Sequence, residues 1–255
     1  MVRPVRMTRT ELKELLLATG LEMLKEEGLA TGAERLTFKR VFDRVEDETG
    51  IRVTNASVIR RIWRDNEDYQ GDVLSLAVSD ENADELDAAV KKADQVLKKA
   101  DLSSPEGRRT AVSELCRVAG GAHAEALSNS RTWHLFVGAW GNIASRPEDQ
   151  WDPRVTEAAQ ATYSALTARL GEIISGFMEV LGLRLRAGMT MEQFSLSVVS
   201  LAEGCALRDR LDPASTRKIR LPSGPGGRRQ EWRLFSVGFE ALVWHFLEMD
   251  TALKA

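Results

Sequence analysis

Apolar residues recur every three or four positions along most of the chain, which is the spacing of one face of an α-helix. The first such run begins after Thr8, which forms a capping-box pattern with Glu11, and it should end near Gly28. Further helices are predicted at residues 105–128, 131–145, 153–181, 190–211 and 231–252. No run of alternating β-branched residues indicates a sheet, so the pattern predicts an all-α fold.

Residues 36–63 have the pattern of two short helices joined by a tight turn. Thr37 is suited to cap the first helix, and Gly50 suits the left-handed position that ends it. Thr54 is suited to cap the second, which has an apolar stripe on one side and cationic residues such as Arg60 and Arg61 on the other. Such a helix fits a DNA major groove, which is about 12 Å wide. The segment therefore predicts a helix-turn-helix.

The pattern divides the chain into a helix-turn-helix domain at 1–66 and a larger helical domain at 67–255. Residues 69–100 keep a helical but acidic pattern and are expected to form the helix that joins the two domains. Prolines and glycines mark the breaks between the later helices. Residues 214–230 include the stretch richest in Gly and Pro and are predicted to form an interhelical loop, whose order the sequence leaves open.

The net charge of −3 is unevenly distributed. Residues 1–64 hold 13 basic and 10 acidic residues, whereas residues 65–102 hold 4 and 11. Attraction to phosphate is screened beyond roughly 10 Å at ordinary salt, so the local surplus on the helix-turn-helix matters more than the total charge. The acidic residues of 65–102 are expected to form a solvated face.

Motifs for catalysis are missing from the sequence. The two cysteines, Cys116 and Cys205, form no CxxC pair, and the three histidines are scattered without a zinc-binding spacing. Neither a phosphate-binding GxxxxGK[ST] loop nor a GxSxG elbow is present. We therefore expect no catalytic residues, no metal and no cofactor.

No apolar run reaches the roughly 18–20 residues of a membrane span, and no signal-peptide pattern follows the N-terminus. A cytoplasmic protein without a membrane partner is therefore expected.

From the turn onward, the helix-turn-helix resembles that of the tetracycline-repressor (TetR) family of transcriptional regulators. The family pattern of a glycine, a Ser/Thr cap and a Thr/Ser followed by apolar and aromatic positions is matched by Gly50, Thr54, Ser57, Val58, Ile59 and Ile62. Residues 201–213 look like the end of the family's penultimate helix. The sequence departs from the family where Arg52 and Val53 look like an insertion in the turn. It also has Ile59 and Ile62 where the family has Tyr and Phe.

The resemblance implies a DNA-binding regulator, in most cases a repressor, that binds a palindromic operator in double-stranded DNA. The residues that it places at DNA are Thr37, Thr54, Asn55, Ala56, Ser57, Arg60, Arg61 and Arg64. The threonines would contact phosphate near helix N-termini, and the residues that follow Thr54 would face base edges. The same residues also suit ordinary capping and a solvated cationic helix face.

The family forms homodimers through its last two helices, which match 190–211 and 231–252 here. The apolar stripes of these segments give the candidate dimer residues Phe194, Val198, Leu201, Phe235, Phe239, Leu242 and Phe246. A small-molecule effector would lie among the central helices, where the candidate ligand residues are Trp133, His134, Phe136, Trp140, Tyr163 and Phe177. Both sets also suit an ordinary intramolecular core.

Two alternatives to a DNA-binding regulator stay open. One is a regulator with a degraded recognition helix that acts through protein contacts, which the insertion of Arg52 and Val53 would favour. The other is a helical small-molecule-binding protein or enzyme with a vestigial helix-turn-helix. DNA binding with a steep dependence on salt would argue against both.

Overall fold

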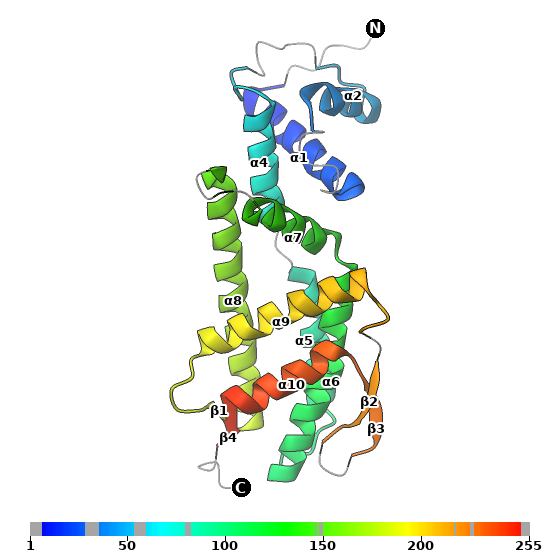
Figure 1. Cartoon of the computed structure of the whole chain (residues 1–255), viewed down its shortest axis with the longest axis vertical. Coiled ribbons are helices and arrows are strands. Elements are labelled where there is room, and N and C mark those ends of the chain that lie inside the picture. Colours follow the sequence, from blue (N-terminus) through cyan, green and yellow to red (C-terminus); the bar gives the residue numbers. More distant parts are fainter. Residues whose placement is uncertain are drawn as a thin grey trace. The chain divides into compact units, whose positions relative to one another are not determined.

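The computed structural model describes residues 7–28, 36–53, 60–79, 83–145, 147, 150–216, 218–224 and 227–250, and it is mostly helical there, as the sequence predicts (Figure 1). The described helices are α1 (Arg9–Glu27), α2 (Phe38–Thr49), α4 (Asn66–Ser79), α5 (Ala83–Leu97), α6 (Pro105–Asn129), α7 (Arg131–Ala144), α8 (Pro153–Leu181), α9 (Met191–Leu211) and α10 (Leu234–Phe246). Among these described residues, no helix is both long and apolar enough to cross a bilayer.

Local capping signals predicted several helix ends correctly. Thr8 and Glu11 form the expected capping box at the start of α1. Thr37 caps α2 by accepting a hydrogen bond from the N–H of Arg40, and Gly50 ends that helix with φ 68° and ψ 7°. A second capping box, Thr190 with Gln193, starts α9. Each feature satisfies backbone groups that a helix end would otherwise leave without partners.

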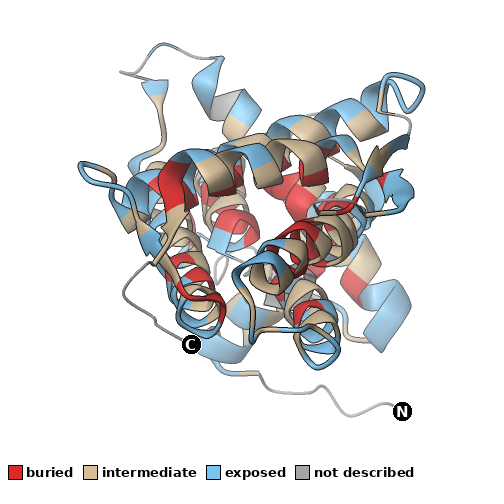
Figure 2. Cartoon of the chain, turned by 90° about the horizontal axis from the view of Figure 1, so that it is seen from below, coloured by how far each residue is buried: buried red, intermediate tan, exposed pale blue. Residues whose placement is uncertain are grey.

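The chain divides into two compact units. The first contains residues 1–81 and 131–163, and the second contains residues 82–130 and 164–255. In the first unit, α1 packs against α2, α4 and α7, and α4 also packs against α7. In the second unit, α6 packs against α5, α9 and α10. Buried residues lie along one side of the helices, as Figure 2 shows, so each unit has an apolar interior.

The region expected to form one joining helix is two helices. The structure has α4 over 66–79 and α5 over 83–97, instead of one helix over 69–100. Helix α4 belongs to the first unit, whereas α5 belongs to the second, where it packs against α6. The helical periodicity of the sequence predicted the type of structure correctly and its continuity wrongly.

The described residues include four short strands, which were not expected. The antiparallel pair β1 (Leu183–Leu185) and β4 (Leu247–Met249) joins the residues after α8 to those after α10. The pair β2 (Ile219–Pro222) and β3 (Arg229–Trp232) forms within the predicted loop 214–230 and just beyond it, so much of that loop is a β-hairpin. Strands of three or four residues are too short for alternation to reveal them in the sequence.

Candidate nucleic-acid interface

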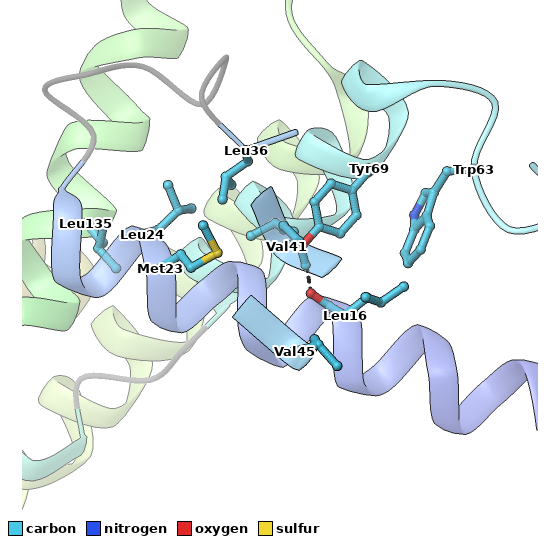
Figure 3. Close-up of a cluster of buried hydrophobic side chains, with 10 residues drawn as sticks. Leu16, Met23, Leu24, Leu36, Val41, Val45, Trp63, Tyr69 and Leu135 are labelled. Atoms are coloured by element: carbon cyan, nitrogen blue, oxygen red, sulfur yellow. Dashed lines mark hydrogen bonds between the residues drawn. The ribbon is translucent and has the colours of Figure 1, made fainter. Parts of the chain in front are cut away.

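Helix α4 supplies the centre of the N-terminal helix cluster. Tyr69 and Val73 of α4 are fully buried against α1 and α2, in a core that also contains Leu16, Val41 and Trp63. Figure 3 shows Tyr69, Leu16, Val41 and Trp63 turned toward one another. The ring of Trp63 meets Tyr69 edge-on, with ring centroids 4.9 Å apart, a favourable arrangement for two aromatic side chains. Trp63, which follows the recognition segment predicted to begin at Thr54, is therefore anchored to α4.

The hydroxyl of Tyr69 ties α4 to α1. It donates a 2.7 Å hydrogen bond to the carbonyl oxygen of Leu16, which is drawn as a dashed line in Figure 3. Burial raises the pKa of the Tyr69 phenol, so the group stays protonated and can donate. Gly20 lies beside this contact, because a Cβ at that position would come within 2.2 Å of the hydroxyl oxygen. The fit leaves no room for a side chain at position 20.

The first turns of α4 also hold the start of α2. The side-chain oxygen of Asn66 accepts a 3.0 Å hydrogen bond from the N–H of Phe38. The amide nitrogen of Gln70 donates a 3.0 Å hydrogen bond to the carbonyl oxygen of Leu36. These two contacts satisfy backbone groups at the entry to α2 that the helix itself leaves without partners. Helix α4 thereby sets where α2 begins.

Two aspartates of α4 hold the residues that follow the recognition segment. Asp72 Oδ2 accepts a 3.0 Å hydrogen bond from the indole N–H of Trp63, and it also lies 3.0 Å from the ammonium of Lys13 in α1. Asp68 Oδ2 accepts a 3.0 Å hydrogen bond from the backbone N–H of Arg64. Both aspartates come from the acidic stretch that the sequence predicted to be merely solvated.

The other oxygens of these aspartates bind Arg154, at the start of α8. Its Nη1 lies 3.0 Å from Asp68 Oδ1 and 2.7 Å from Asp72 Oδ1. Its Nε and Nη2 donate to the two oxygens of Asp152 at 3.1 and 2.8 Å. We call Arg154, Asp152, Asp68 and Asp72 the Arg154 network. A Cβ at Gly71 would lie 2.3 Å from Arg154 Nη2, so the network depends on a glycine at that position.

The electrostatics of the network favour its charged form. Burial raises the pKa of Asp72, but hydrogen bonds from Trp63 and Lys13 and the charges of Lys13 and Arg154 outweigh it, so the pKa lies below the ordinary 3.8. Hydrogen bonds from Arg154 hold the pKa of Asp152 below the same value, against the effect of its partial burial. The carboxylates in turn raise the pKa of Arg154. All three groups are therefore ionised at neutral pH.

The cationic residues predicted to contact DNA lie at the surface where the structure describes them. Arg60 and Arg61 lie in a turn, not on the helix that the sequence predicted for them, and both are exposed. The side chain of Arg64 is 84% exposed. Arg9 of α1 donates to the carbonyl oxygen of Arg61, which ties this turn to the first helix. Thr37 caps α2 as expected. Thr54, Asn55, Ala56 and Ser57 lie outside the described residues, so their contact with bases stays a prediction.

Two further arginines on α2 are paired with acidic residues. Arg40 binds both oxygens of Glu27 at 3.2 and 2.6 Å. Arg44 binds Glu26 at 2.8 Å and also pairs with Glu48 on its own helix. The glutamates at the end of α1 therefore offset the positive charge of α2, whereas Arg60 and Arg61 have no acidic side chain recorded against them in the described ranges.

The aromatic residues proposed for an effector lie mostly in the core of the first unit. Trp133 and Phe136 of α7 are 2% and 3% exposed. Tyr163 meets Phe136 edge-on at 5.0 Å and lies 5.7 Å from Trp140, between ring centroids. His134 is half-buried beside Trp133. Phe177 belongs to the second unit. The residues of the first unit are packed against one another, which is also how an ordinary core is built.

The second unit contains a cavity that the sequence did not indicate. It has a volume of about 650 Å³, within the range of about 300–1,000 Å³ that small-molecule sites occupy. Its wall includes Val96 of α5, Lys99 and Asp101 of the following turn, and Glu106 and Glu114 of α6. The pKa of Glu114 lies below its ordinary value, because the hydrogen bond from Arg117, 2.6 Å from Glu114 Oε2, acts against the effect of burial. The wall thus has both apolar and polar surface, and it carries more negative than positive side chains.

The residues proposed for a dimer interface mostly face the interior of the second unit. Phe194, Val198, Phe235 and Phe246 are 0–9% exposed. The rings of Phe194 and Phe246 stack with centroids 5.2 Å apart, and Phe235 stacks on Phe239 at 5.7 Å. Leu201 lies against Gly238, and Leu242 is half-buried.

The exposed side of α9 has a different apolar stripe. Leu196, Leu207 and Leu211 are 54%, 42% and 74% exposed. Ser200 and Gly204 lie between them at helical spacing and are exposed as well. A side chain at Gly204 would meet no atom of the chain within 4 Å. Small residues flanked by leucines on an exposed helix face would let a second helix approach closely.

No family model and no curated protein matches the sequence. Among solved structures, the chain is similar to a candidate transcriptional regulator from Pseudomonas aeruginosa PAO1, with 18% identity over 84% of this chain and 86% of that one and a TM-score of 0.43. It is also similar to a protein of unknown function from Rhodococcus sp. RHA1, with 15% identity over 96% of this chain and 98% of that one and a TM-score of 0.44. At these identities and TM-scores, neither similarity bears on function.

Proposed function

We propose that this protein is a DNA-binding transcriptional regulator of the TetR type that binds a palindromic operator through the segment after Gly50. The main support is the exposed cationic turn Arg60–Arg61, which follows that segment and is fixed to α1 and α4 by Arg9, Trp63 and Arg64. Arginines on a rigid support are suited to bind phosphates or guanine edges, because little conformational freedom is lost on binding.

The test is a selection from a random pool of duplex DNA with the purified protein, followed by titration of the enriched duplex at several salt concentrations. We expect a palindrome whose affinity falls as salt rises, because phosphate contacts release counterions. Arg60→Ala should weaken binding roughly tenfold, and it should lower the salt slope by about one if Arg60 contacts phosphate. Arg131→Ala removes an exposed arginine at the start of α7 and is the matched control. No enrichment at low salt would reject the proposal in favour of action through protein contacts.

The proposed regulator acts as a homodimer in which the exposed stripe of α9 meets a second copy. Leu196, Leu207 and Leu211 would be buried by such contact, and Ser200 and Gly204 would let two helices come close. Leu196→Glu should therefore shift the mass measured by light scattering at micromolar concentration from dimer to monomer. Val180→Glu is the control, because Val180 of α8 is 50% exposed, nearly as much as Leu196. A monomer mass for the wild type would contradict this part of the proposal.

A small-molecule effector is the third part of the proposal, and the α5–α6 cavity is the space that suits it by size. Thermal shift against a panel of small molecules would find binders. Thr110→Trp, which places a large ring at the cavity wall, should abolish the shift produced by a compound that binds there. Trp140→Ala tests the aromatic cluster in the same way. A compound affected by neither substitution would bind at another place.

A further inference from the structure

In both Asp68 and Asp72, the two carboxylate oxygens bind different partners, and the arrangement is the same in the two residues. In both residues Oδ1 accepts from Nη1 of Arg154. In both residues Oδ2 accepts from the two residues that follow the recognition segment, namely the N–H of Arg64 for Asp68 and the indole N–H of Trp63 for Asp72. The aspartates are four residues apart on α4 and so lie on one face of that helix. One guanidinium thus contacts both carboxylates that hold residues 63–64.

We propose that Arg154 is a positioning residue for residues 60–64, and that it fixes them through Asp68 and Asp72. Its part in DNA affinity rests on the proposed function, whereas its hold on residues 60–64 does not. Because Arg154 is the second residue of α8, a displacement of the start of α8 moves the partner of both carboxylates. The beginning of α8 therefore controls how firmly residues 60–64 are held.

The placement of Arg154 is itself tightly fixed. Asp152 binds its Nε and Nη2, which leaves Nη1 for the two aspartates of α4. The carbonyl oxygen of Arg154 accepts a 3.3 Å hydrogen bond from the hydroxyl of Ser75 on α4. Gly71 leaves the space in which the Arg154–Asp152 pair lies against α4. A planar guanidinium can serve three carboxylates at once, which the ammonium of a lysine cannot do with the same geometry.

The burial of the network makes these contacts stronger than those of ordinary surface pairs. The side chains of Asp68 and Asp72 are only 16% and 18% exposed, and that of Arg154 is 38% exposed. Without Arg154, three carboxylates would lie close together. The cations that remain against them in the described ranges are the ammonium of Lys13, 3.0 Å from Asp72, and the exposed guanidinium of Arg64, whose Nε lies 3.7 Å from Asp68 Oδ2. Their mutual repulsion would push Asp68 and Asp72 away from their present positions. The hydrogen bonds to Arg64 and Trp63 would then weaken together.

The first experiment follows amide hydrogen exchange by mass spectrometry in the full chain without DNA. In Arg154→Gln, peptides that cover residues 60–65 should exchange roughly fivefold or more faster than in the wild type, because the N–H of Arg64 loses its fixed acceptor. Peptides from α6 should exchange at the wild-type rate, which separates local release from general unfolding. Arg154→Lys should give an intermediate rate. Unchanged exchange at 60–65 in Arg154→Gln would overturn the inference.

Arg169→Gln is the matched control for this experiment. Arg169 is also an arginine of α8, its side chain is likewise 38% exposed, and it pairs with Asp87 at 2.8 Å. It has no recorded contact with residues 60–64, so its loss should leave exchange there unchanged.

Combining Arg154→Gln with Asp72→Asn tests whether Arg154 acts on residues 60–64 through the carboxylates of α4. Two increases in exchange rate are compared: that caused by Arg154→Gln in the wild type, and that caused by the same substitution in Asp72→Asn. If Arg154 acts through the carboxylates, the second increase should be the smaller one. If the two substitutions had fully additive effects on the exchange rate, Arg154 would not act through Asp72.

The second experiment measures affinity for the duplex enriched from the random pool. Arg154→Gln should bind it about tenfold more weakly than the wild type, whereas Arg169→Gln should bind with wild-type affinity. If Arg154→Gln exchanged faster at 60–65 but bound DNA with unchanged affinity, the inference that Arg154 influences DNA binding would be wrong. If the wild type enriches no duplex, the proposed function fails, and the exchange experiment alone still decides whether Arg154 positions residues 60–64.

Discussion

Gly20 of α1 lies directly against the hydroxyl of Tyr69 on α4. A Cβ at position 20 would be 2.2 Å from the hydroxyl oxygen and 3.0 Å from Val73 Cγ2. The first distance is far shorter than any van der Waals contact, so even one methyl group would force Tyr69 to move. The approach of the two helices, and the hydrogen bond from Tyr69 to Leu16, therefore depend on this glycine.

We expect Gly20→Ala to destabilise the protein by about 1–3 kcal/mol, the usual cost of overpacking a fixed core. Helix propensity alone would give the opposite sign, because alanine is favoured over glycine by about 1 kcal/mol in a helix interior. Chemical denaturation followed by circular dichroism gives the difference. Gly176→Ala is the control, since a side chain there meets nothing within 4 Å and should be neutral or stabilising. Adding Tyr69→Phe to Gly20→Ala should recover part of the lost stability.

The Arg154 network makes a prediction for acid stability. The pKa values of Asp72 and Asp152 are lower in the folded chain than the ordinary 3.8, so both groups release their protons more readily when folded. Their contribution to stability is therefore fully present above pH 3.8 and is lost as the pH falls through the lower folded values. The groups that face Asp72 are Lys13, Trp63 and Arg154, with Asp68 beside it on α4.

We expect the free energy of unfolding to fall steeply below about pH 4, and Asp152→Asn to make that fall shallower. Urea denaturation at pH 3 to 7 measures both slopes. Asp87→Asn removes a more exposed aspartate, paired with Arg169, and is the control. An identical pH profile for Asp152→Asn and the wild type would mean that the network does not carry the acid dependence.

The sequence predicted the parts of this structure that depend on neighbouring residues. The capping box of Thr8 and Glu11, the cap at Thr37 and the left-handed Gly50 involve residues that are close in sequence, so their patterns are visible without a structure. Arg154 and Asp72 are 82 positions apart, and nothing in the composition of either segment links them. Asp68 and Asp72 looked like part of a solvated acidic face because charge counts do not indicate which carboxylates meet an arginine.

The same limit explains the apolar stripes. The spacing of Phe194 and Val198 marks one buried face of α9, but spacing does not show whether that face meets the same chain or a second copy. The structure packs both residues inside the protomer and leaves Leu196 and Leu207 exposed on the other side. Likewise, Trp133 and Phe136 have the composition of a ligand pocket, and only packing reveals how deeply they are buried.

The two cysteines should differ sharply in reactivity. Cys116 is 1% exposed, and burial together with the nearby charge of Glu240 raises the pKa of its thiol. Cys205 is half-buried, and its pKa is raised by burial and by Asp209. Because the thiolate is the reactive form, a thiol reagent at pH 8 should modify Cys205 slowly and Cys116 only after unfolding. Mass spectrometry of Cys205→Ser and Cys116→Ser variants assigns each rate, and equal rates for both thiols in the folded protein would contradict this expectation.

The acidic partners of α2 give a prediction for DNA binding itself. Glu27 binds Arg40 through both oxygens, so the charge of Arg40 is partly offset before DNA arrives. The first helix of a helix-turn-helix crosses the DNA backbone. If the protein binds DNA as proposed, cationic residues of α2 would lie where they can contact phosphate. Glu27→Gln should therefore strengthen binding to the enriched duplex a few-fold at low salt. It should also steepen the salt slope by up to about one counterion.

The control for Glu27→Gln is a substitution that removes the same charge without releasing an arginine. Glu14 is an exposed residue of α1, and no ion pair with it is recorded in the described part of the chain. Glu14→Gln changes the net charge by the same amount, so it isolates the long-range effect of charge, which salt largely screens. A gain in affinity for Glu27→Gln alone would show that Arg40 reaches phosphate once it is released. Equal gains for both variants would mean that only net charge matters and that α2 does not contact the backbone.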